Sequence, residues 1–564
     1  MKNRKKIIVI GGSAAGPKAA AKARRLDQHA DITIIQKDTD LSMASCGYPY
    51  YVSGEVKDRK SLISTAYGII RDPDFFQTSK GIQAFIETEV SEIDRKNHTV
   101  TCKNLKTGEI TRFDYDKLII ATGARAKLPP IAGNTLPGIS TMHSMPDVDY
   151  LKTARDQGAI KQAIVIGGGL IGIEVCEALQ ISGIQVTVVE MLPQVLTFLD
   201  WELAKLVENH VRSKTAKVIT DLAVSEFIGK EKLEAIKLSD GTSLPCELAV
   251  IAIGVSPNTT LARKAGLSIG KFGGIDVNKY MQTSDPDIYA IGDCVEVNNR
   301  ITGNKTFAPM GDLANLQGRV AGENAAAGNR VTFPGTIQTG ICKVFDFSAG
   351  STGLSETRAR AAGFNIISVI TAGPDKPAFM NGKPLVTKMV AEAVTGKVLG
   401  VQCVGLGDVS KQIGQAAMAI QGNLTVEDLS NADLPYAPPF SLAIDNLIAT
   451  AHSLGNKMKG RLESISAVEV KSRLDNGKTP FILDIREQHE YDMIHLGIGE
   501  KLIPLGEVRS RMDELPQDKE REIICYCKVS LRGYETSLFL KANGWKNVKV
   551  MEGGILAWPF ALEQ

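Results

Sequence analysis

The chain twice repeats a β-branched run, a glycine-rich turn and a helix-forming stretch. The first copy is IIVIGGSAAG at residues 7–16, and the second is AIVIGGGLIG at residues 163–172. Glycines at these offsets after a buried strand allow a tight turn and let backbone N–H groups at a helix N-terminus approach a pyrophosphate. The pattern predicts two Rossmann-like dinucleotide-binding units on parallel sheets, and therefore an α/β fold.

The second turn has the complete G-x-G-x-x-G spacing, and the strand that follows it, VTVVE, ends in an acid. A carboxylate at that place accepts hydrogen bonds from an adenosine ribose and repels a 2′-phosphate. This unit is therefore expected to prefer NADH to NADPH. Its candidate cofactor contacts are Gly167, Gly169, Leu170, Ile171, Gly172 and Glu190.

The first turn is less regular, because Ser13 stands at the middle glycine position and the next strand ends in Gln36 instead of an acid. An amide can still hydrogen-bond a ribose hydroxyl. The candidate contacts of this unit are Gly11, Gly12, Ser13, Ala14, Ala15, Gly16, Gln36 and Lys37. Two later strand ends add Thr122 with Gly123, and Gly292 with Asp293, whose carboxylate can bond a ribityl or ribose hydroxyl. Gly254, at the end of ELAVIAIG, is a further candidate cofactor contact.

These segments, in this order and spacing, resemble the family of pyridine nucleotide-disulfide reductases over roughly residues 5–450. The resemblance implies that the first unit and the later strand ends hold FAD and that the second unit holds NAD(P)H. It also implies that electrons pass from nicotinamide through flavin to a sulfur centre.

The expected sulfur centre is a single cysteine, Cys46, with Ser45 beside it in SMASCGYPY. A lone thiol must cycle through a mixed disulfide, a persulfide or a sulfenic acid. The segment is similar to that of coenzyme A disulfide reductases and NADH-dependent persulfide reductases. That resemblance implies a homodimer in which Tyr436 of the partner subunit acts on the substrate sulfur. The subfamily's second tyrosine falls near Phe379, where no hydroxyl is present, which weighs against coenzyme A disulfide as the best substrate; coenzyme A remains a candidate ligand.

The last hundred or so residues resemble a rhodanese domain, through FILDIRE, the following EY and IH pairs, and the terminal GG and Trp558. The strand REIICYC leads into a six-residue loop from Cys527 to Arg532. Inward N–H groups, the next helix N-terminus and Arg532 favour a thiolate and an anionic persulfide there. Cys525 lies on the same strand face, either as a core thiol or as a resolving thiol.

The expected architecture is two Rossmann-like FAD- and NAD-binding domains, an α+β interface domain and a C-terminal α/β rhodanese domain. The expected boundaries are 1–150 and 281–331 for the FAD-binding domain, 151–280 for the NAD-binding domain, 332–450 for the dimerisation domain, 451–464 for a linker and 465–564 for the rhodanese domain.

Charge and cysteine usage exclude several other classes. The 564 residues carry 65 Lys and Arg against 63 Asp and Glu, a net charge of +2, so neither nucleic acid nor a membrane is an expected partner. No apolar run reaches the 18 or so residues that a bilayer requires, and a cytoplasmic protein is expected. The nine cysteines show no metal-ligand spacing, so no metal is expected.

We therefore expect an FAD- and NADH-dependent reductase of persulfides, polysulfides or coenzyme A disulfide, with Cys46, Tyr436, Cys527 and Arg532 as catalytic residues. One alternative is an NADH oxidase or peroxidase that uses Cys46 as a sulfenic acid, and another is a redox sensor with a binding tail. The thiol carrier and the direction of sulfur flow between Cys527 and Cys46 stay open.

Overall fold

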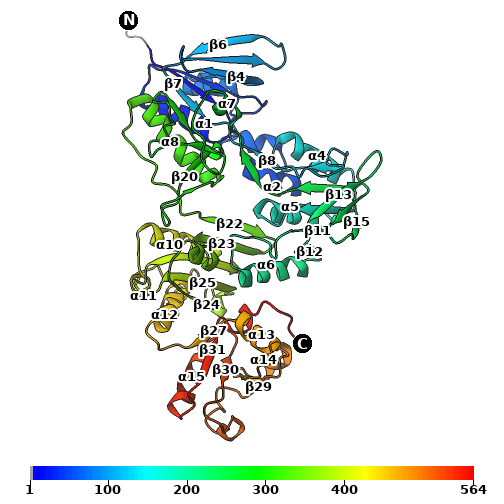
Figure 1. Ribbon diagram of the computed structural model, residues 1–564, viewed down its shortest axis with the longest axis vertical. Coiled ribbons are helices and arrows are strands. Elements are labelled where there is room, and N and C mark those ends of the chain that lie inside the picture. Colours follow the sequence, from blue (N-terminus) through cyan, green and yellow to red (C-terminus); the bar gives the residue numbers. More distant parts are fainter. Residues whose placement is uncertain (1–3, 564) are drawn as a thin grey trace. The chain divides into compact units, whose positions relative to one another are not determined.

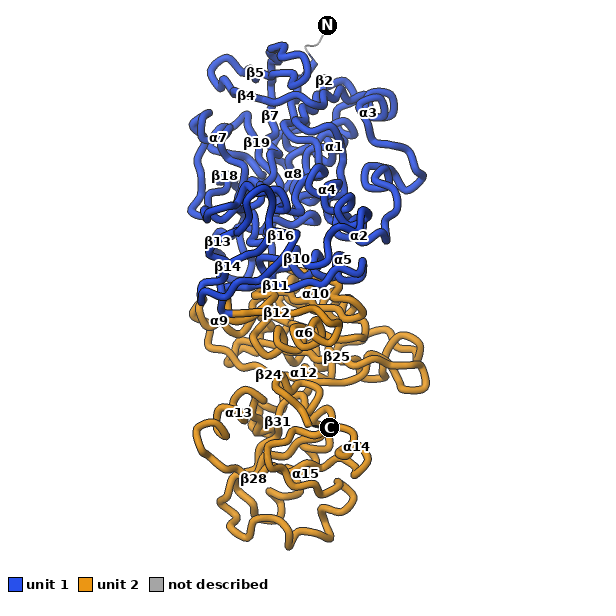
Figure 2. The backbone as a smooth tube through the Cα atoms, turned by 90° about the vertical axis from the view of Figure 1, so that its right-hand side faces the viewer, with its two compact units in different colours: residues 1–191, 221–336 blue, residues 192–220, 337–564 orange. Residues whose placement is uncertain are grey.

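The fold was obtained as a computed structural model, which describes residues 4–563. Figure 1 shows the order of helices and strands, and Figure 2 shows the two compact units into which the chain divides. The first unit contains residues 1–191 and 221–336, and the second contains residues 192–220 and 337–564. Within the described residues, the longest apolar helices fall short of what a bilayer crossing needs.

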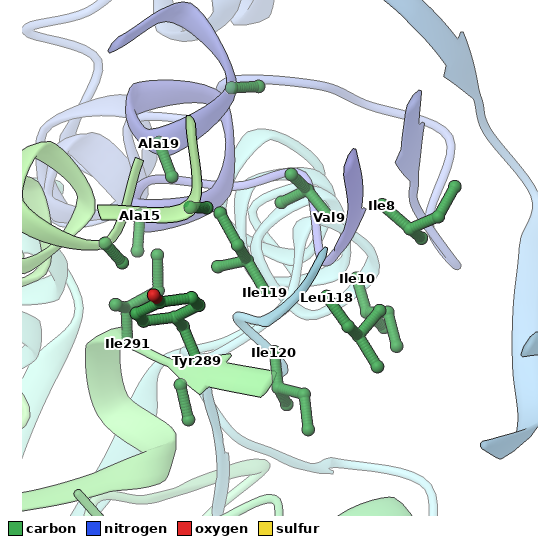
Figure 3. Close-up of a cluster of buried hydrophobic side chains, with 14 of the residues drawn as sticks. Ile8, Val9, Ile10, Ala15, Ala19, Leu118, Ile119, Ile120, Tyr289 and Ile291 are labelled. Carbon is green, nitrogen blue, oxygen red and sulfur yellow. The ribbon is translucent and has the colours of Figure 1, made fainter. Parts of the chain in front are cut away.

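The first dinucleotide-binding unit is built on a parallel sheet with the strand order β19-β7-β1-β2-β3. Figure 3 shows Val9, Ile119 and Tyr289 from three of these strands gathered beside Ala15 and Ala19 of the first helix. The strands are β1 (Lys6–Ile10), β2 (Asp31–Ile35), β3 (Gln83–Phe85), β7 (Lys117–Ile120) and β19 (Ile288–Ala290). The buried, β-branched strands and parallel pairing confirm the predicted fold class.

Helices α1 (Ala15–Leu26) and α8 (Gly311–Ala327) pack against each other beside this sheet. Small residues permit the close approach, because a Cβ on Gly322 would lie 2.3 Å from the Ala19 carbonyl oxygen. The contact therefore brings Gly318, far along the chain, to the start of α1, where a Cβ on Gly318 would lie 2.7 Å from the Ala15 carbonyl oxygen.

The second dinucleotide-binding unit has a parallel sheet in which β11, β10, β16 and β9 are neighbours in that order. These strands are β11 (Gln185–Val189), β10 (Gln162–Ile166), β16 (Leu248–Ile251) and β9 (Ile139–Ser140), with helices α4 (Met145–Asp156) and α5 (Leu170–Gln180). Because β9 belongs to this sheet, the boundary predicted at residue 150 is too late. The boundary predicted at 280 is also too late, since β18 (Ile275–Asp276) pairs with β20 (Val295–Asn298). Two-residue strands carry no periodic signal that would reveal this.

Shorter elements complete the first unit. They are α2 (Tyr48–Ser53), α3 (Pro73–Lys80), α7 (Thr260–Lys264), β4 (Thr88–Asp94), β5 (Thr99–Asn104), β6 (Ile110–Asp114), β8 (Ala124–Ala126), β13 (Val224–Ile228), β14 (Ala235–Leu238), β15 (Ser243–Pro245), β17 (Val255–Pro257) and β21 (Lys305–Thr306).

The second compact unit contains an antiparallel sheet in the order β22-β23-β26-β25-β24. Its strands are β22 (Gly340–Val344), β23 (Phe347–Gly353), β24 (Ile366–Pro374), β25 (Pro384–Glu392) and β26 (Val398–Gly405). The helices of this part are α6 (Trp201–Ser213), α9 (Glu356–Ala361), α10 (Val409–Gln421), α11 (Val426–Ser430) and α12 (Asn446–Met458), and β12 (Lys217–Ile219) follows α6.

The predicted linker over 451–464 is wrong for more than half of its length, because α12 continues to Met458. The helix packs on β24 and β25 and buries an apolar face that includes Leu447, Ala451 and Leu454. Polar residues such as His452 and Lys457 between these apolar positions gave the segment its linker-like composition.

The C-terminal domain is a parallel sheet in the order β27-β31-β30-β28-β29. The strands are β27 (Ser464–Ile465), β28 (Phe481–Asp484), β29 (Lys501–Leu502), β30 (Ile523–Tyr526) and β31 (Val548–Met551), and the helices are α13 (Ala467–Asp475), α14 (Gln488–Met493) and α15 (Leu531–Ala542).

One buried carboxylate joins this domain to the antiparallel sheet. Glu552, directly after β31, accepts a hydrogen bond from the Ile370 backbone N–H of β24 at 2.9 Å. Its other oxygen accepts hydrogen bonds from Lys457 Nζ and Ser464 Oγ, both at 2.6 Å. The two domains are therefore held together by polar contacts on both sides of the short connection.

A buried lysine with three carboxylates ties α6 and α9 to β25. Lys388 Nζ lies 3.2 Å from Asp200, 2.5 Å from Glu202 and 2.9 Å from Glu356. Burial alone would lower the pKa of Lys388, but the three carboxylates raise it. Burial likewise opposes ionisation of Glu356, yet Lys388 brings the pKa of that carboxyl down to about 2.

Replacing Lys388 by methionine should destabilise the second unit by about 3–5 kcal/mol, because the carboxylates would stay buried without their cation. Thermal unfolding followed by circular dichroism measures this, with Lys459→Met, whose surface pair with Glu427 is exposed, as the matched control. The pKa values of Asp200 and Glu356 are lowered in the folded state, so the stabilisation is present above about pH 4.5 and is lost as pH falls toward 2. A variant as stable as the wild type at pH 7 would contradict this role.

Candidate functional site

The two glycine-rich turns have matching backbone geometry. Gly11 and Gly167 have left-handed φ angles of 107° and 104°. A Cβ on Gly11 would lie 2.1 Å from the Ala121 carbonyl oxygen, and a Cβ on Gly167 would lie 2.5 Å from that of Ala252. Both positions therefore require glycine for conformation and for space.

The other two glycine positions differ in what they contact. A Cβ on Gly16 or on Gly172 would lie 1.9 Å from the carbonyl oxygen of the first glycine of its own turn. By contrast, a Cβ on Gly169 would meet no atom within 4 Å, so the space beside this turn is open. Exposed Ser13 takes that position in the first turn.

The helices after both turns begin without a side-chain cap. Helix α1 starts at Ala15 with Ala14 as its N-cap, and α5 starts at Leu170, followed by half-exposed Ile171. N-terminal N–H groups that no side chain satisfies are donors for an anionic group, and the helix dipole favours it. These residues fit a dinucleotide pyrophosphate at each turn.

Gln36 and Glu190 occupy equivalent positions and make equivalent hydrogen bonds. Gln36 Oε1 accepts from the Gly12 N–H at 2.7 Å, and Glu190 Oε2 accepts from the Gly168 N–H at 2.7 Å. Each side chain therefore holds its glycine-rich turn. Neighbouring Lys37 forms a surface ion pair with Glu89.

Thr122 and Gly123 follow β7, and Gly254 follows β16. The Thr122 hydroxyl donates to the Asn258 carbonyl oxygen at 2.7 Å. Gly123 and Gly254 both have positive φ, and a Cβ on either would meet nothing within 4 Å. The space beside the backbone is therefore open at Gly123 and at Gly254.

Gly292 and Asp293 follow β19 in a single helical turn. The Gly292 N–H donates to Gln317 Oε1 of α8 at 2.7 Å, which fixes the turn. Burial raises the pKa of Asp293 above its ordinary value. Its carboxyl is therefore a partly buried polar group placed at the end of a sheet strand.

Cys46 lies in a short helical turn, Ser45–Gly47, immediately before α2. It is exposed, whereas the other eight cysteines are buried. A Cβ on Gly311 would lie 3.6 Å from Cys46 Sγ, so α8 begins beside the thiol. Partial burial and the nearby carboxylates of Glu174 and Asp293 raise the pKa of Cys46. The surrounding side chains therefore favour the neutral thiol of Cys46 over its thiolate.

Cys527 begins the loop between β30 and α15 and is completely buried, like Cys525. The Ile555 N–H donates to the Cys527 carbonyl oxygen at 3.0 Å, so the segment after Gly554 covers the loop. Ser530 has a left-handed φ of 83°, an unusual conformation for a residue with a side chain. Residues 527–532 thus form an enclosed loop with a strained backbone at Ser530, and this loop is called the cradle below.

Arg532, in the first turn of α15, lies between Glu490 and the loop that begins at Cys527. Its guanidinium donates to the Glu490 carboxylate at 2.7 and 2.9 Å. The hydrogen bond to Glu490 and the proximity of Cys527 raise the pKa of Arg532, and Arg532 lowers the pKa of Glu490 to about 2. A fixed ion pair beside the sulfur is the main electrostatic feature of this site.

Tyr436 lies in the loop between α11 and α12 and is 54% exposed. Phe379, which stands where the resemblance predicts a second tyrosine, is 76% exposed in the turn Ala378–Met380. Both aromatic side chains are therefore available at the surface of the described chain.

Sequence reasoning missed two carboxyls at these sites. Burial and Glu177 raise the pKa of Glu174 to about 7, and Glu174 in turn acts on Cys46. Glu490 stands in the rhodanese-like signature, which marks its position but not its pairing with Arg532. Among the described residues, no three His, Cys, Asp or Glu side chains gather as a metal site.

The chain belongs to the pyridine nucleotide-disulphide oxidoreductase family, which its residues 5–311 match. Residues 339–448 match the dimerisation domain of the same family, and residues 466–560 match the rhodanese-like domain. The predicted family is therefore confirmed, and the family implies the use of FAD and NAD(P)H.

The chain is similar to several named proteins. The solved structure of a NAD-dependent persulfide reductase from A. fulgidus is 41% identical, with a TM-score of 0.93, and the match covers 98% of this chain and 100% of that one. A protein of Pyrococcus furiosus named NAD(P)H sulfur oxidoreductase (CoA-dependent) is 33% identical over 80% of this chain and 99% of its own length. A protein of Methanocaldococcus jannaschii named NADH oxidase is 34% identical over the same share of this chain and 99% of its own.

Proposed function

We propose that the protein is an FAD-dependent, NADH-using persulfide reductase with a sulfur-carrying rhodanese domain, acting as a homodimer. The observation that carries the proposal is the exposed thiol of Cys46 beside the start of α8, on the same chain as the enclosed rhodanese-like loop that begins at Cys527. The overall reaction is RSSH + NADH + H⁺ → RSH + H₂S + NAD⁺, in which the S–S bond is reduced and NADH is oxidised.

FAD, when bound, supplies the transfer of two electrons from NADH to sulfur. The residues proposed to hold it are Gly11, Gly12, Ser13, Ala14, Ala15, Gly16, Gln36, Lys37, Ser45, Thr122, Gly123, Gly292 and Asp293. Those proposed for NADH are Gly167, Gly169, Leu170, Ile171, Gly172, Glu190 and Gly254. The open space at Gly169 and the uncapped helices support this assignment.

Cys46 acts as the nucleophile. It attacks the inner sulfur of the persulfide RS–SH, the sulfur bonded to R, so that hydrosulfide leaves and a mixed disulfide between Cys46 and RS forms. The leaving sulfur then needs a proton or a hydrogen bond. We assign that task to Tyr436 of the partner subunit, which the exposure of this side chain supports. Coenzyme A is a candidate carrier of the persulfide.

Removing the Tyr436 hydroxyl should lower persulfide reduction moderately. For Tyr436→Phe we expect a loss of kcat on the order of 10²-fold, the lower end of general acid catalysis. Stopped-flow and steady-state assays measure it, with Tyr67→Phe, an exposed tyrosine of another loop, as the control. An unchanged kcat would leave Tyr436 with a packing role only.

The nicotinamide preference should depend on the charge of Glu190. We expect Glu190→Gln to keep the hydrogen bond to Gly168, as Gln36 does in the first turn, while it narrows the NADH preference by about tenfold. The ratio of kcat/KM for NADH and NADPH measures the change. A wild-type preference for NADPH, or an unchanged ratio in the variant, would contradict the placement of the ribose at Glu190.

The test of the function is anaerobic NADH oxidation with coenzyme A persulfide, polysulfide, coenzyme A disulfide and peroxide at equal concentrations, with sulfide quantified. We expect the highest kcat/KM with persulfide and one sulfide released per NADH. The alternative, an NADH oxidase or peroxidase, is favoured by the Methanocaldococcus relative. Fast peroxide or oxygen reduction without sulfide release would support that alternative and refute the proposal.

A further inference from the structure

The rhodanese-like cradle contains a guanidinium whose charge is already matched. Arg532 is bound through two parallel hydrogen bonds to Glu490 of α14, an arrangement with fixed geometry. Their side chains are 27% and 19% exposed, so water screens the pair only in part. The charge of Arg532 also interacts with the nearby Cys527, so the same cation acts on the reacting residue.

The second buried cation of this region is matched as well. Arg486, next to α14, pairs with Asp484 at 2.7 Å, and both side chains are almost fully buried. Arg486 also donates to the Glu490 backbone carbonyl at 3.2 Å, which helps to hold Glu490 in place. The one other basic residue of the loop, Lys528, is exposed. The two arginines at the cradle are therefore each balanced by one carboxylate, and together these pairs add little net charge to it.

This balance bears on which sulfur donor the site accepts. In the transfer step the Cys527 thiolate attacks the outer sulfur of the donor, the new S–S bond forms, and the old bond breaks with its electron pair leaving on the remainder of the donor. No net oxidation takes place. With thiosulfate the leaving group is the sulfite dianion, and with a persulfide anion it is a thiolate, so thiosulfate brings one more negative charge into the cradle.

We propose that Glu490 determines the donor specificity of the Cys527 site by neutralising Arg532, so that monoanionic persulfides are accepted in preference to dianionic thiosulfate. The inference rests on the proposed function, because it requires that Cys527 carries sulfane sulfur. Glu490 is a specificity-determining residue here: it acts through Arg532 and does not touch the reacting sulfur.

The decisive variant is Glu490→Gln, which removes the charge and keeps an oxygen acceptor for Arg532. Sulfur transfer to cyanide is measured with thiosulfate and with glutathione persulfide as donors, on the full-length holoenzyme. We expect the ratio of kcat/KM for thiosulfate to that for the persulfide to rise on the order of tenfold, because one nearby charge is removed in a partly screened site. The gain should shrink as ionic strength rises.

Two further variants separate charge from position. Glu490→Asp keeps the charge on a shorter side chain, and its donor ratio should stay near the wild-type value even where both rates fall. Glu535→Gln removes one charge from an exposed position on α15, the helix that carries Arg532, and should leave the ratio unchanged.

The outcomes distinguish this inference from the function on which it rests. A wild-type protein that transfers sulfur from neither donor would refute a sulfur-carrying role for Cys527. If the wild type transfers sulfur but Glu490→Gln loses both activities in proportion, Glu490 only positions Arg532 and the inference is overturned. An equal rise in the ratio with Glu535→Gln would also overturn it, since the effect would then come from net charge.

Discussion

NADH turnover with sulfur acceptors is expected to fall by roughly 10³-fold or more when Cys46 is replaced by serine. A serine hydroxyl is a far weaker sulfur nucleophile than a thiolate at neutral pH, and the eight other cysteines are buried and cannot substitute for Cys46. The measurement is anaerobic NADH oxidation with a persulfide donor, together with sulfide release.

The variant should keep its cofactor, because Cys46 lies in a surface turn and its removal leaves the sheets intact. The FAD content and the loss of flavin absorbance on addition of NADH are therefore the controls. Persulfide reduction at the wild-type rate in Cys46→Ser would mean that another group is the nucleophile. Loss of FAD together with activity would make the variant uninformative on its own, and Cys46→Ala with restored cofactor would then decide the question.

Sulfurtransferase activity should disappear when Cys527 is replaced by serine, since no other thiol stands at the start of this cradle. Reduction of small soluble persulfides through Cys46 should persist, because it does not pass through the cradle. Turnover with bulky or elemental sulfur donors should fall. Arg532→Ala should weaken the same transfer step and leave NADH-dependent flavin reduction unchanged.

Mass spectrometry of protein treated with a persulfide donor in the absence of NADH gives a direct measurement. We expect an adduct of about 32 Da, one sulfur atom, on the Cys527 peptide. Cys525→Ala is the matched control, because this thiol lies in the same strand and is equally buried. A full adduct on Cys46 with none on Cys527 would leave the C-terminal domain without a sulfur-carrying role.

Local sequence patterns were sufficient where the chemistry depends on neighbouring residues. The positions of Gly11, Gly16, Gly167 and Gly172 follow from strand and turn spacing, and their close backbone contacts explain why spacing is so informative. What the pattern does not reveal is that Glu190 and its counterpart in the first unit both bind their own turn.

Local sequence patterns could not predict ion pairs between residues that are far apart in the sequence. Glu490 and Arg532 are brought together by α14 and α15, and Lys388 meets Asp200 and Glu202 across a large gap in sequence. Each of these residues is unremarkable in its own segment. Their roles depend on which elements become neighbours, which only the tertiary structure decides.

The contact between Glu552 and β24 has a consequence for solubility. Strand β24 is the edge of its sheet, and its sequence, IISVITAGP, contains no charged residue. Such an edge offers unpaired backbone groups to other chains and is prone to aggregate. The Glu552 carboxylate takes up the Ile370 N–H, and the C-terminal domain lies against that strand. The C-terminal domain thus also covers the aggregation-prone edge strand β24. A chain shortened to end at α12 would expose this strand to pairing with other protein chains.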